Sequence, residues 1–156
     1  MTKERGSDAR VTLREITSKT VRTICKLSDT LPETQAGMVA PNAVSIADAH
    51  FAEHAWFRAI YTDEMPIGFV MLWDDPDKGE YSLWWLMIAA EHQRKGYGRR
   101  AIEGLVEYVK SGLDATELRA SHVPIEGGPG EFYGKLGFEE TGQIVHGERV
   151  IRLPLT

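Results

Sequence analysis

A basic turn with two glycines separates an apolar run from a helical pattern past the middle of the chain. The turn covers residues 93–101, the apolar run residues 83–88 and the helical pattern residues 102–109. This order predicts a strand, a tight turn and the start of a helix. Glycine lets a backbone approach a ligand closely, and the free N–H groups at a helix start attract anions. We therefore predict that this turn binds the pyrophosphate of a cofactor.

Three interpretations of the turn are open on its residues alone. Gly96, Gly98 and Ala101 match the dinucleotide fingerprint G-x-G-x-x-[GA], but that fingerprint belongs to the first strand-helix unit of its domain. A nucleotide P-loop, G-x-x-x-x-G-K-[ST], does not occur in the chain. The third interpretation is a helix start with a basic face and no ligand. A second motif is needed to exclude it.

Such a motif follows in residues 131–138, where an aromatic pair on a short predicted helix precedes a glycine turn. Together the two strings resemble the GNAT family of N-acetyltransferases, and the resemblance covers residues 11–155. The family's turn, [QR]-x-x-G-x-[GA], and its C-terminal string, F-Y-x-K-x-G-F, occur here in the family's order. The matching residues are Gln93, Gly96 and Gly98 in the turn, and Phe132, Tyr133, Lys135, Gly137 and Phe138 in the C-terminal string.

Strand and helix patterns alternate in the order β-α-α-β-β-β-α-β-α-β-β. This order predicts an α/β fold, an α+β mixed sheet with helices on both faces, and it is the order that the resemblance implies for the GNAT acyl-CoA N-acyltransferase fold. We expect one domain, residues 11–156, after a flexible end at residues 1–10. The predicted strands are residues 11–16, an antiparallel meander of 56–61, 67–73 and 81–88, then 117–123 and a hairpin from residue 138 with Gly147 near its tip; the predicted helices are residues 19–27, 46–54 after a Ser45 cap, 99–110 and 129–136.

Length and composition narrow the class of protein further. A chain of 156 residues suits one domain, and a net charge of −5 argues against a nucleic-acid partner. The single cysteine, Cys25, cannot form an intramolecular disulfide, and its place on a helix predicts a small buried side chain rather than a reactive thiol. No signal peptide and no apolar run of membrane-spanning length occurs, so we expect no membrane partner and a cytoplasmic location.

The resemblance implies acetyl-CoA as the cofactor. Backbone N–H groups of the turn would surround its pyrophosphate, and the end of the fourth strand would offer backbone groups to its pantetheine arm where the two central strands separate. An amide near Met87 or Ile88 would polarise the thioester. We expect no metal ion. The expected cofactor-binding residues are Leu86, Met87, Ile88, Gln93, Arg94, Lys95, Gly96, Tyr97, Gly98, Arg99, Arg100, Phe132 and Lys135.

Tyr133 is the candidate general acid. A phenol has an ordinary pKa of about 10, so it is protonated at neutral pH. This pKa is close enough to that of a thiol, about 8.5, for the phenol to donate a proton to a leaving thiolate. The alternative is a core tyrosine whose hydroxyl is bonded elsewhere. The base is open, because Trp84 and Trp85 occupy the fourth strand where polyamine-acetylating relatives often carry a carboxylate. The candidates are Glu80, His122 or a carboxylate that acts through water.

Residues 38–47, 68–71 and 123–124 are similar to bacterial spermine and spermidine N-acetyltransferases. This closer resemblance implies direct acetyl transfer, in a ternary complex, to a primary amine of a small cationic substrate, and a homodimer. The chain has Trp-Trp where those enzymes have Trp-Arg, so an aminoglycoside antibiotic is the second acceptor and a protein amine the third. A non-catalytic acyl-CoA sensor is the alternative from another class. The residues expected to bind the acceptor are Glu33, Glu53 and Glu126, which could instead be solvated, and Trp84 and Trp85 as cation–π faces.

Overall fold

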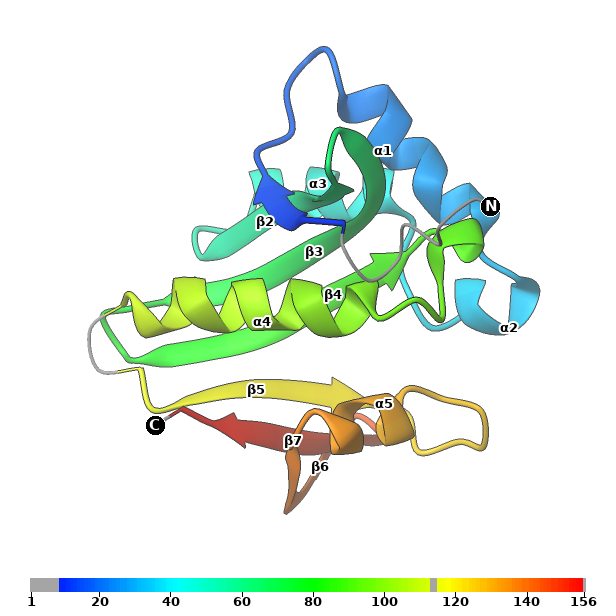
Figure 1. Cartoon of the computed structure of the whole chain (residues 1–156). Coiled ribbons are helices and arrows are strands. Elements are labelled where there is room, and N and C mark those ends of the chain that lie inside the picture. Colours follow the sequence, from blue (N-terminus) through cyan, green and yellow to red (C-terminus); the bar gives the residue numbers. More distant parts are fainter. Residues whose placement is uncertain (1–8, 113–114, 156) are drawn as a thin grey trace.

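The computed structural model describes residues 9–112 and 115–155, and seven of its strands form one mixed sheet (Figure 1). The strands are β1 (Val11–Arg14), β2 (Ala55–Thr62), β3 (Met65–Asp75), β4 (Glu80–Ile88), β5 (Glu117–His122), β6 (Glu139–Val145) and β7 (Glu148–Pro154). Their order in the sheet is β1-β2-β3-β4-β5-β7-β6. Neighbouring strands are antiparallel except for β4 and β5, which are parallel. The predicted mixed α/β architecture and its antiparallel meander are confirmed.

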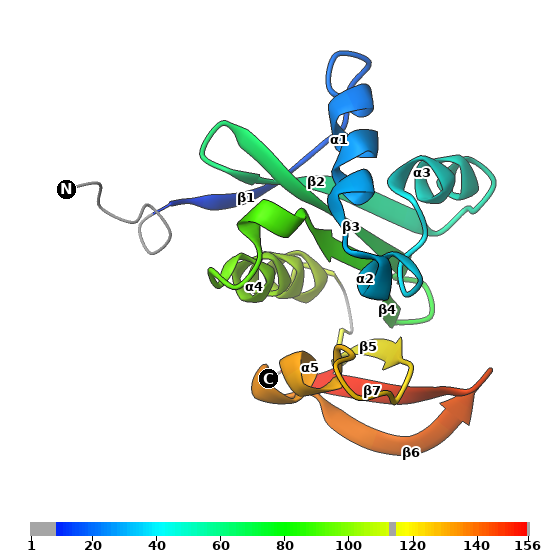
Figure 2. The same ribbon diagram turned by 90° about the vertical axis from the view of Figure 1, so that its right-hand side faces the viewer.

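The described helices cover both faces of the sheet. They are α1 (Val21–Leu27), α2 (Glu33–Ala36), α3 (Asn42–His50), α4 (Tyr97–Lys110) and α5 (Gly130–Lys135), with 3₁₀ turns at Ser28–Thr30 and Ala90–His92. Figure 2 shows α1 and α3 on one side of β2 to β4, and α4 on the other side. This arrangement makes two hydrophobic cores, one on each face.

Alternation along β3 supplies both cores. Val70 and Leu72 point to the core under α4, whereas Phe69 and Met71 point to the core under α1 and α3. All four side chains are fully buried. Burial of each side chain contributes about 1.5–3 kcal/mol, so β3 stabilises both layers of the fold.

The helix before β2 was predicted wrongly. We expected residues 46–54 with a Ser45 cap, but α3 spans Asn42–His50 and Ser45 lies buried within it. Pro41 precedes the first helical residue, and its fixed φ of −53° suits a helix entry. Asn42 is also buried and donates a hydrogen bond from Nδ2 to the Ile24 carbonyl oxygen (2.8 Å), which ties α3 to α1. The one-turn helix α2 lies in the segment between the predicted helices 19–27 and 46–54, where we expected no helix.

The start of the chain also differs from the prediction in detail. The helix expected from residue 19 begins at Val21, and Cys25 on it is half-buried rather than buried, because Ile24 points into the core. Of the flexible end expected at residues 1–10, residues 1–8 lie outside the described residues. Ala9 is buried, and its carbonyl oxygen accepts a hydrogen bond from Arg100 Nη1 (2.6 Å).

Two local features shape the end of the sheet where the site lies. In the described sheet, Ser82 and Arg119 are the one registered pair between β4 and β5, so the strands part toward their C-terminal ends. The hairpin of β6 and β7 turns at His146 and Gly147, which both have positive φ (51° and 78°), as the two-residue turn of a twisted hairpin requires. The predicted place of Gly147 is confirmed. No helix in the described ranges is long and apolar enough to cross a bilayer.

Candidate active site

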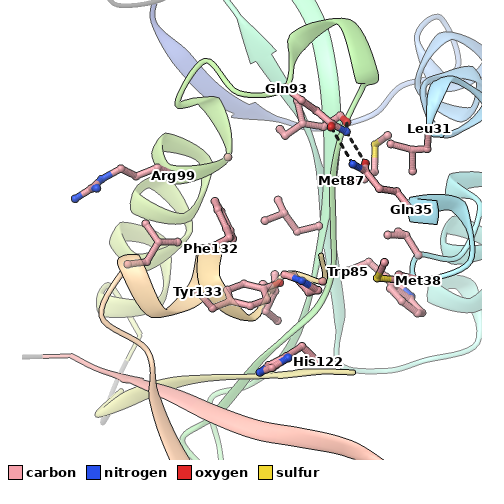
Figure 3. A pocket seen from close by; sticks show the side chains of 18 of the residues that line it. Leu31, Gln35, Met38, Trp85, Met87, Gln93, Arg99, His122, Phe132 and Tyr133 are labelled. Atoms are coloured by element: carbon pink, nitrogen blue, oxygen red, sulfur yellow. Dashed lines mark hydrogen bonds between the residues drawn. The ribbon is translucent and has the colours of Figure 1, made fainter. Parts of the chain in front are cut away.

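A cleft of about 880 Å³ lies where β4 and β5 part (Figure 3). It is lined from both faces of the sheet. Leu86 and Tyr133 belong to the core under α4, whereas Trp85 and Met87 belong to the core under α1 and α3. The cleft therefore passes through the sheet at the gap between the two central strands.

Most of the described residues that line the cleft fall into three groups, and the others are Ser82, Leu83, Leu86, Met87, Ile88, His92, Gln93, Gly127, Gly128 and Pro129. The first group, which we call the helix half, comes from α4, α5 and the turn before α4. The second, the tryptophan half, comes from the segment between α1 and α3 and from the tryptophans of β3 and β4. The third, the β5–β7 wall, lies at the end of β5 and the start of β7. The helix half is Arg94, Gly96, Tyr97, Gly98, Arg99, Phe132, Tyr133, Lys135 and Leu136; the tryptophan half is Leu31, Gln35, Met38, Val39, Trp73, Trp84 and Trp85; the β5–β7 wall is Ser121, His122, Val123 and Glu148.

Backbone conformation defines the helix half. Arg94 and Gly96 are both left-handed, with φ of 62° and 84°, and such alternation in a turn aims backbone N–H groups into one anion-binding concavity. Gly96 precedes the first residue of α4 and has no side chain to cap it, so the first N–H groups of the helix are left for a ligand. Arg94, Arg99 and Lys135 add positive charge at the rim. This half is built to bind a polyanion.

Gly98 serves a packing role in the same half. A Cβ at Gly98 would lie 3.3 Å from the Phe132 ring, tighter than most Cβ contacts. The glycine therefore lets α5 pack its aromatic residue against the first turn of α4. The two strings that carried the family resemblance meet at this contact.

A pair of glutamines joins the helix half to the tryptophan half. Gln93 donates from Nε2 to Gln35 Oε1 (2.7 Å), and Gln35 donates from Nε2 to Gln93 Oε1 (3.1 Å). Gln93 Nε2 also donates to the Ile88 carbonyl oxygen (2.8 Å). The dashed lines in Figure 3 show the reciprocal pair between α2 and the turn. The sequence motif marked Gln93 but gave no sign of its partner.

Tyr133 and His122 lie close together in the middle of the cleft. Tyr133 is 9% exposed, and burial raises the pKa of its phenol to about 12. His122 is 8% exposed at the end of β5, and its ring centroid lies 6.4 Å from that of Tyr133. A Cβ at Gly130 would come within 2.9 Å of His122 Cε1, so the glycine at the start of α5 lets the helix lie against the imidazole.

A β-bulge builds the tryptophan half. Met71 of β3 faces Trp85 of β4, but the next residue, Leu72, faces Leu83, so Trp84 is an extra residue in β4. The bulge resets the alternation of side chains. Trp84 and Trp85 therefore both pack on the face of α1 and α3, although they are adjacent in sequence. Trp73 joins them, with its ring centroid 6.2 Å from that of Trp84.

The family model for the acetyltransferase (GNAT) family matches residues 24–138, which is more than half of the chain. The chain belongs to the GNAT family. It is an acetyl-CoA-dependent N-acetyltransferase, and the predicted family, fold and cofactor are confirmed. A comparison with proteins of curated function finds no match.

Solved GNAT structures share the fold at low sequence identity. The PaiA N-acetyltransferase from Thermoplasma acidophilum, in complex with coenzyme A, is 16% identical with a TM-score of 0.70 over 93% of this chain and 99% of that chain. A chimera of the spermidine N-acetyltransferase SpeG from Vibrio cholerae with hSSAT is 19% identical, with a TM-score of 0.71 over 94% and 96% of the two chains. An Escherichia coli N-acetyltransferase for an alanine of a ribosomal protein is 13% identical, with a TM-score of 0.69 over 94% and 95%. The acceptor subgroup and the homodimer stay predictions.

The structure brings most of the predicted site residues of this GNAT domain to the cleft and leaves six outside its lining. Glu80 is exposed at the start of β4, the opposite end from Ile88, and Arg100 turns to Ala9. The predicted residues that line the cleft are Leu86, Met87, Ile88, Gln93, Arg94, Gly96, Tyr97, Gly98, Arg99, Phe132, Lys135, Tyr133, His122, Trp84 and Trp85; those that do not are Lys95, Arg100, Glu80, Glu33, Glu53 and Glu126.

The sequence reasoning missed one acidic residue in the cleft. Glu148 is the one carboxylate among the described residues that line it. It begins β7 directly after the turn at Gly147. A carboxylate beside a turn is typical of a solvated surface, so no local pattern distinguished Glu148 from the other acids of the chain. Trp73, Met38 and Gln35 were missed for a similar reason, because their place depends on distant elements.

Proposed function

We propose that the helix half holds acetyl-CoA and that the acetyl group passes directly to a primary amine of a small molecule bound toward the tryptophan half. The observation that carries this proposal is the continuity of the cleft. It connects an anion-binding turn, a buried Tyr133 and an apolar pocket on the other face of the sheet. Both reactants can therefore meet in one ternary complex.

The helix half fits acetyl-CoA on its own geometry. The left-handed Arg94 and Gly96, with the uncapped start of α4, suit a pyrophosphate. Arg99 and Lys135 each pair with a glutamate one turn away on the same helix, at 3.3 and 3.4 Å. Exposed pairs of this kind contribute about 0–1 kcal/mol, so these cations can turn to a phosphate at little cost. Backbone groups of residues 86–88 border the gap through which the pantetheine arm would pass.

The reaction needs a proton donor and a proton acceptor on the protein. Acetyl-CoA supplies an acetyl thioester, whose C–S bond breaks as a C–N bond forms to the amine, while one proton leaves nitrogen and one reaches sulfur. Tyr133 Oη is the proposed donor, since burial keeps the phenol neutral with a pKa of about 12. The same burial makes it a weaker acid than an exposed tyrosine, so its first role is a hydrogen bond to the sulfur as charge develops.

His122 is the proposed base. It lines the cleft beside Tyr133, whereas Glu80 lies outside the lining at the far end of β4. An imidazole can accept a proton at neutral pH. Backbone N–H groups near Met87 and Ile88 are the proposed donors to the thioester oxygen.

The cleft favours an acceptor with one ammonium group over a polycation. Glu33, Glu53 and Glu126, expected to attract a polyamine, are exposed and outside the lining, and Glu148 is the one carboxylate among the described lining residues. Each unpaired ammonium that enters such a pocket costs several kcal/mol, whereas a cation–π contact returns about 0.5–2 kcal/mol. The polyamine stays the second candidate, because SpeG shares the fold. The same lack of carboxylates weighs against an aminoglycoside.

Release of thiol from acetyl-CoA tests the function. We expect wild-type protein to release coenzyme A when a suitable primary amine is added, and Tyr133→Phe to bind acetyl-CoA with unchanged affinity in calorimetry while it loses most of this release. Binding of acetyl-CoA without turnover on any monoamine, polyamine or aminoglycoside would instead identify a sensor.

A further inference from the structure

We infer that the tryptophan half binds a flat apolar group, so that the acceptor is a monoamine that carries an aromatic ring. This inference rests on the proposed acetyl transfer, because it assigns the acceptor of that same cleft.

The walls of the tryptophan half are mainly aromatic and apolar, with the amide of Gln35 and the indole N–H of Trp85 as polar groups. Trp73, Trp84 and Trp85 line it together with the aliphatic side chains of Leu31 and Val39. The indoles of Trp73 and Trp84 are in contact with each other, and the ring centroid of His54 lies 5.1 Å from that of Trp73, which holds the pair in place. Indole rings present wide rigid surfaces that pack well against another flat ring. A long flexible chain would leave most of these surfaces in contact with water.

Charge separates the two ends of the cleft. Every described lining residue that precedes Ser82 in the chain is uncharged, namely Leu31, Gln35, Met38, Val39 and Trp73. An acceptor that enters this half must therefore leave its ammonium elsewhere, because a desolvated charge without a partner is strongly unfavourable.

The β5–β7 wall is the place for that ammonium. Glu148 lies there, and the next residue, Arg149, is the cross-strand partner of His122. Because consecutive residues of a strand point to opposite faces, Glu148 and His122 border the gap between β4 and β5 from opposite faces of the sheet. One carboxylate can pair with one ammonium, and an amine nitrogen that reaches into the gap from Glu148 meets the imidazole of His122, which lines the same cleft. The amine would thus lie beside Tyr133 while the apolar group extends toward the tryptophans. The arrangement selects for one charge at one end of the acceptor and a ring at the other.

Three probes and one matched pair of variants test the assignment. The probes are 2-phenylethylamine, ethylamine, which lacks the ring, and spermidine, which carries several charges. The readouts are thiol release and calorimetric binding of each probe to protein saturated with coenzyme A. The variants are Trp84→Ala and Trp56→Ala, because Trp56 is also half-buried and stacked on Tyr108 but is absent from the cleft lining. Trp84→Phe serves as a conservative replacement that keeps a ring.

We expect kcat/KM for 2-phenylethylamine to exceed that for ethylamine and for spermidine by tenfold or more. Trp84→Ala should raise the KM for 2-phenylethylamine about tenfold, while the KM for ethylamine and the affinity for coenzyme A stay unchanged. Trp84→Phe should return the KM for 2-phenylethylamine most of the way to the wild-type value. Trp56→Ala should leave this KM unchanged.

Preference for spermidine, or equal effects of Trp84→Ala on the ring-bearing and ring-free amines, would overturn the assignment and leave the acetyltransferase proposal intact. If none of the amines causes thiol release, the acetyltransferase proposal is contradicted. Calorimetric binding of 2-phenylethylamine would then show by itself whether the tryptophan half binds an aromatic ring. Should Trp84→Ala fail to fold, the same comparison is made with Trp73→Ala, where a KM raised for 2-phenylethylamine alone would support the assignment and an equal effect on both amines would overturn it.

Discussion

We propose that the two halves of the cleft recognise their ligands by different means. The helix half uses backbone N–H groups, which the left-handed Arg94 and Gly96 and the start of α4 bring together. The tryptophan half uses side chains alone, and the bulge at Trp84 decides where two of them point. A site made of backbone tolerates many sequences, so it serves a whole family. A site made of three indoles depends on the identity of each side chain, so we expect this half to set which acceptor is used.

The largest effect is expected at Tyr133, where the halves meet. Tyr133→Phe removes the proton donor and leaves the ring packing intact, so kcat should fall by about 10²–10⁴-fold, the usual contribution of general acid catalysis. The affinity for acetyl-CoA should not change, because the ring still packs in the helix half and the lost hydrogen bond to sulfur strengthens only as charge develops in the reaction. Steady-state kinetics with calorimetry measures both quantities. A kcat within twofold of wild type would remove the phenol from the mechanism.

A smaller effect is expected at Gly96, where a substitution should weaken the binding of acetyl-CoA to the helix half without changing the binding of the amine. Gly96→Ala places a side chain at φ 84°, which costs about 1–2 kcal/mol, so acetyl-CoA should bind roughly tenfold more weakly. Gly37→Ala is the matched control, since Gly37 has a φ of −76° and open space around it. The KM for the amine should stay constant in both variants. Equal acetyl-CoA affinity in both would show that the turn geometry does not bind the cofactor.

A still smaller effect is expected from breaking the glutamine pair that joins the two halves. Gln35→Leu removes both hydrogen bonds of the glutamine pair, each with a net contribution of about 0.5–1.5 kcal/mol. The variant should raise the KM for the amine about three- to tenfold with little change in kcat, because α2 loses its tie to the turn. Gln143→Leu, on the exposed strand β6, controls for the change of side chain. The second substitution, Gln93→Leu, should add little to the first, because the pair is already broken; if the two single effects simply add in the double variant, the glutamines act separately.

The smallest effect concerns pH. The folded pKa of Tyr133 is raised by burial from 10 to about 12, so its neutral donor form is complete below the ordinary value of 10 and is lost only as pH rises through about 12. The kcat profile should therefore show no decline from this group between pH 8 and about 10.5. A downward limb near pH 10 in wild type that vanishes in Tyr133→Phe would mean that the phenol is accessible to water during turnover.

Sequence reasoning worked where the signal was local. The turn at Gly96 and the hairpins depend on residues next to one another, and the family strings fix the contact of Gly98 with Phe132 through a spacing that the fold requires. The Ser45 cap failed because α3 already begins at Asn42, after Pro41, so that Ser45 lies buried inside the helix, and because the side chain of Asn42 bonds to Ile24 far along the chain. Such partners are not visible in sequence.

The acceptor site could not be predicted for the same reason. Glu33, Glu53 and Glu126 were chosen by charge, but charge says nothing about which carboxylate a fold turns inward. Glu148 reaches the cleft because β7 pairs with β5, and Trp84 shares a face with Trp85 because of a register shift between β3 and β4. Both the strand pairing and the register shift depend on contacts between distant parts of the chain, so the local sequence does not reveal them.

A crystal structure of the protein with coenzyme A tests the central claim most directly, since that claim is one continuous cleft from the start of α4 to Tyr133. We predict the pyrophosphate against the N–H groups of residues 94–99 and the sulfur within about 3.5 Å of Tyr133 Oη. A coenzyme bound outside the gap between β4 and β5, or a sulfur that does not approach Tyr133, would contradict the account.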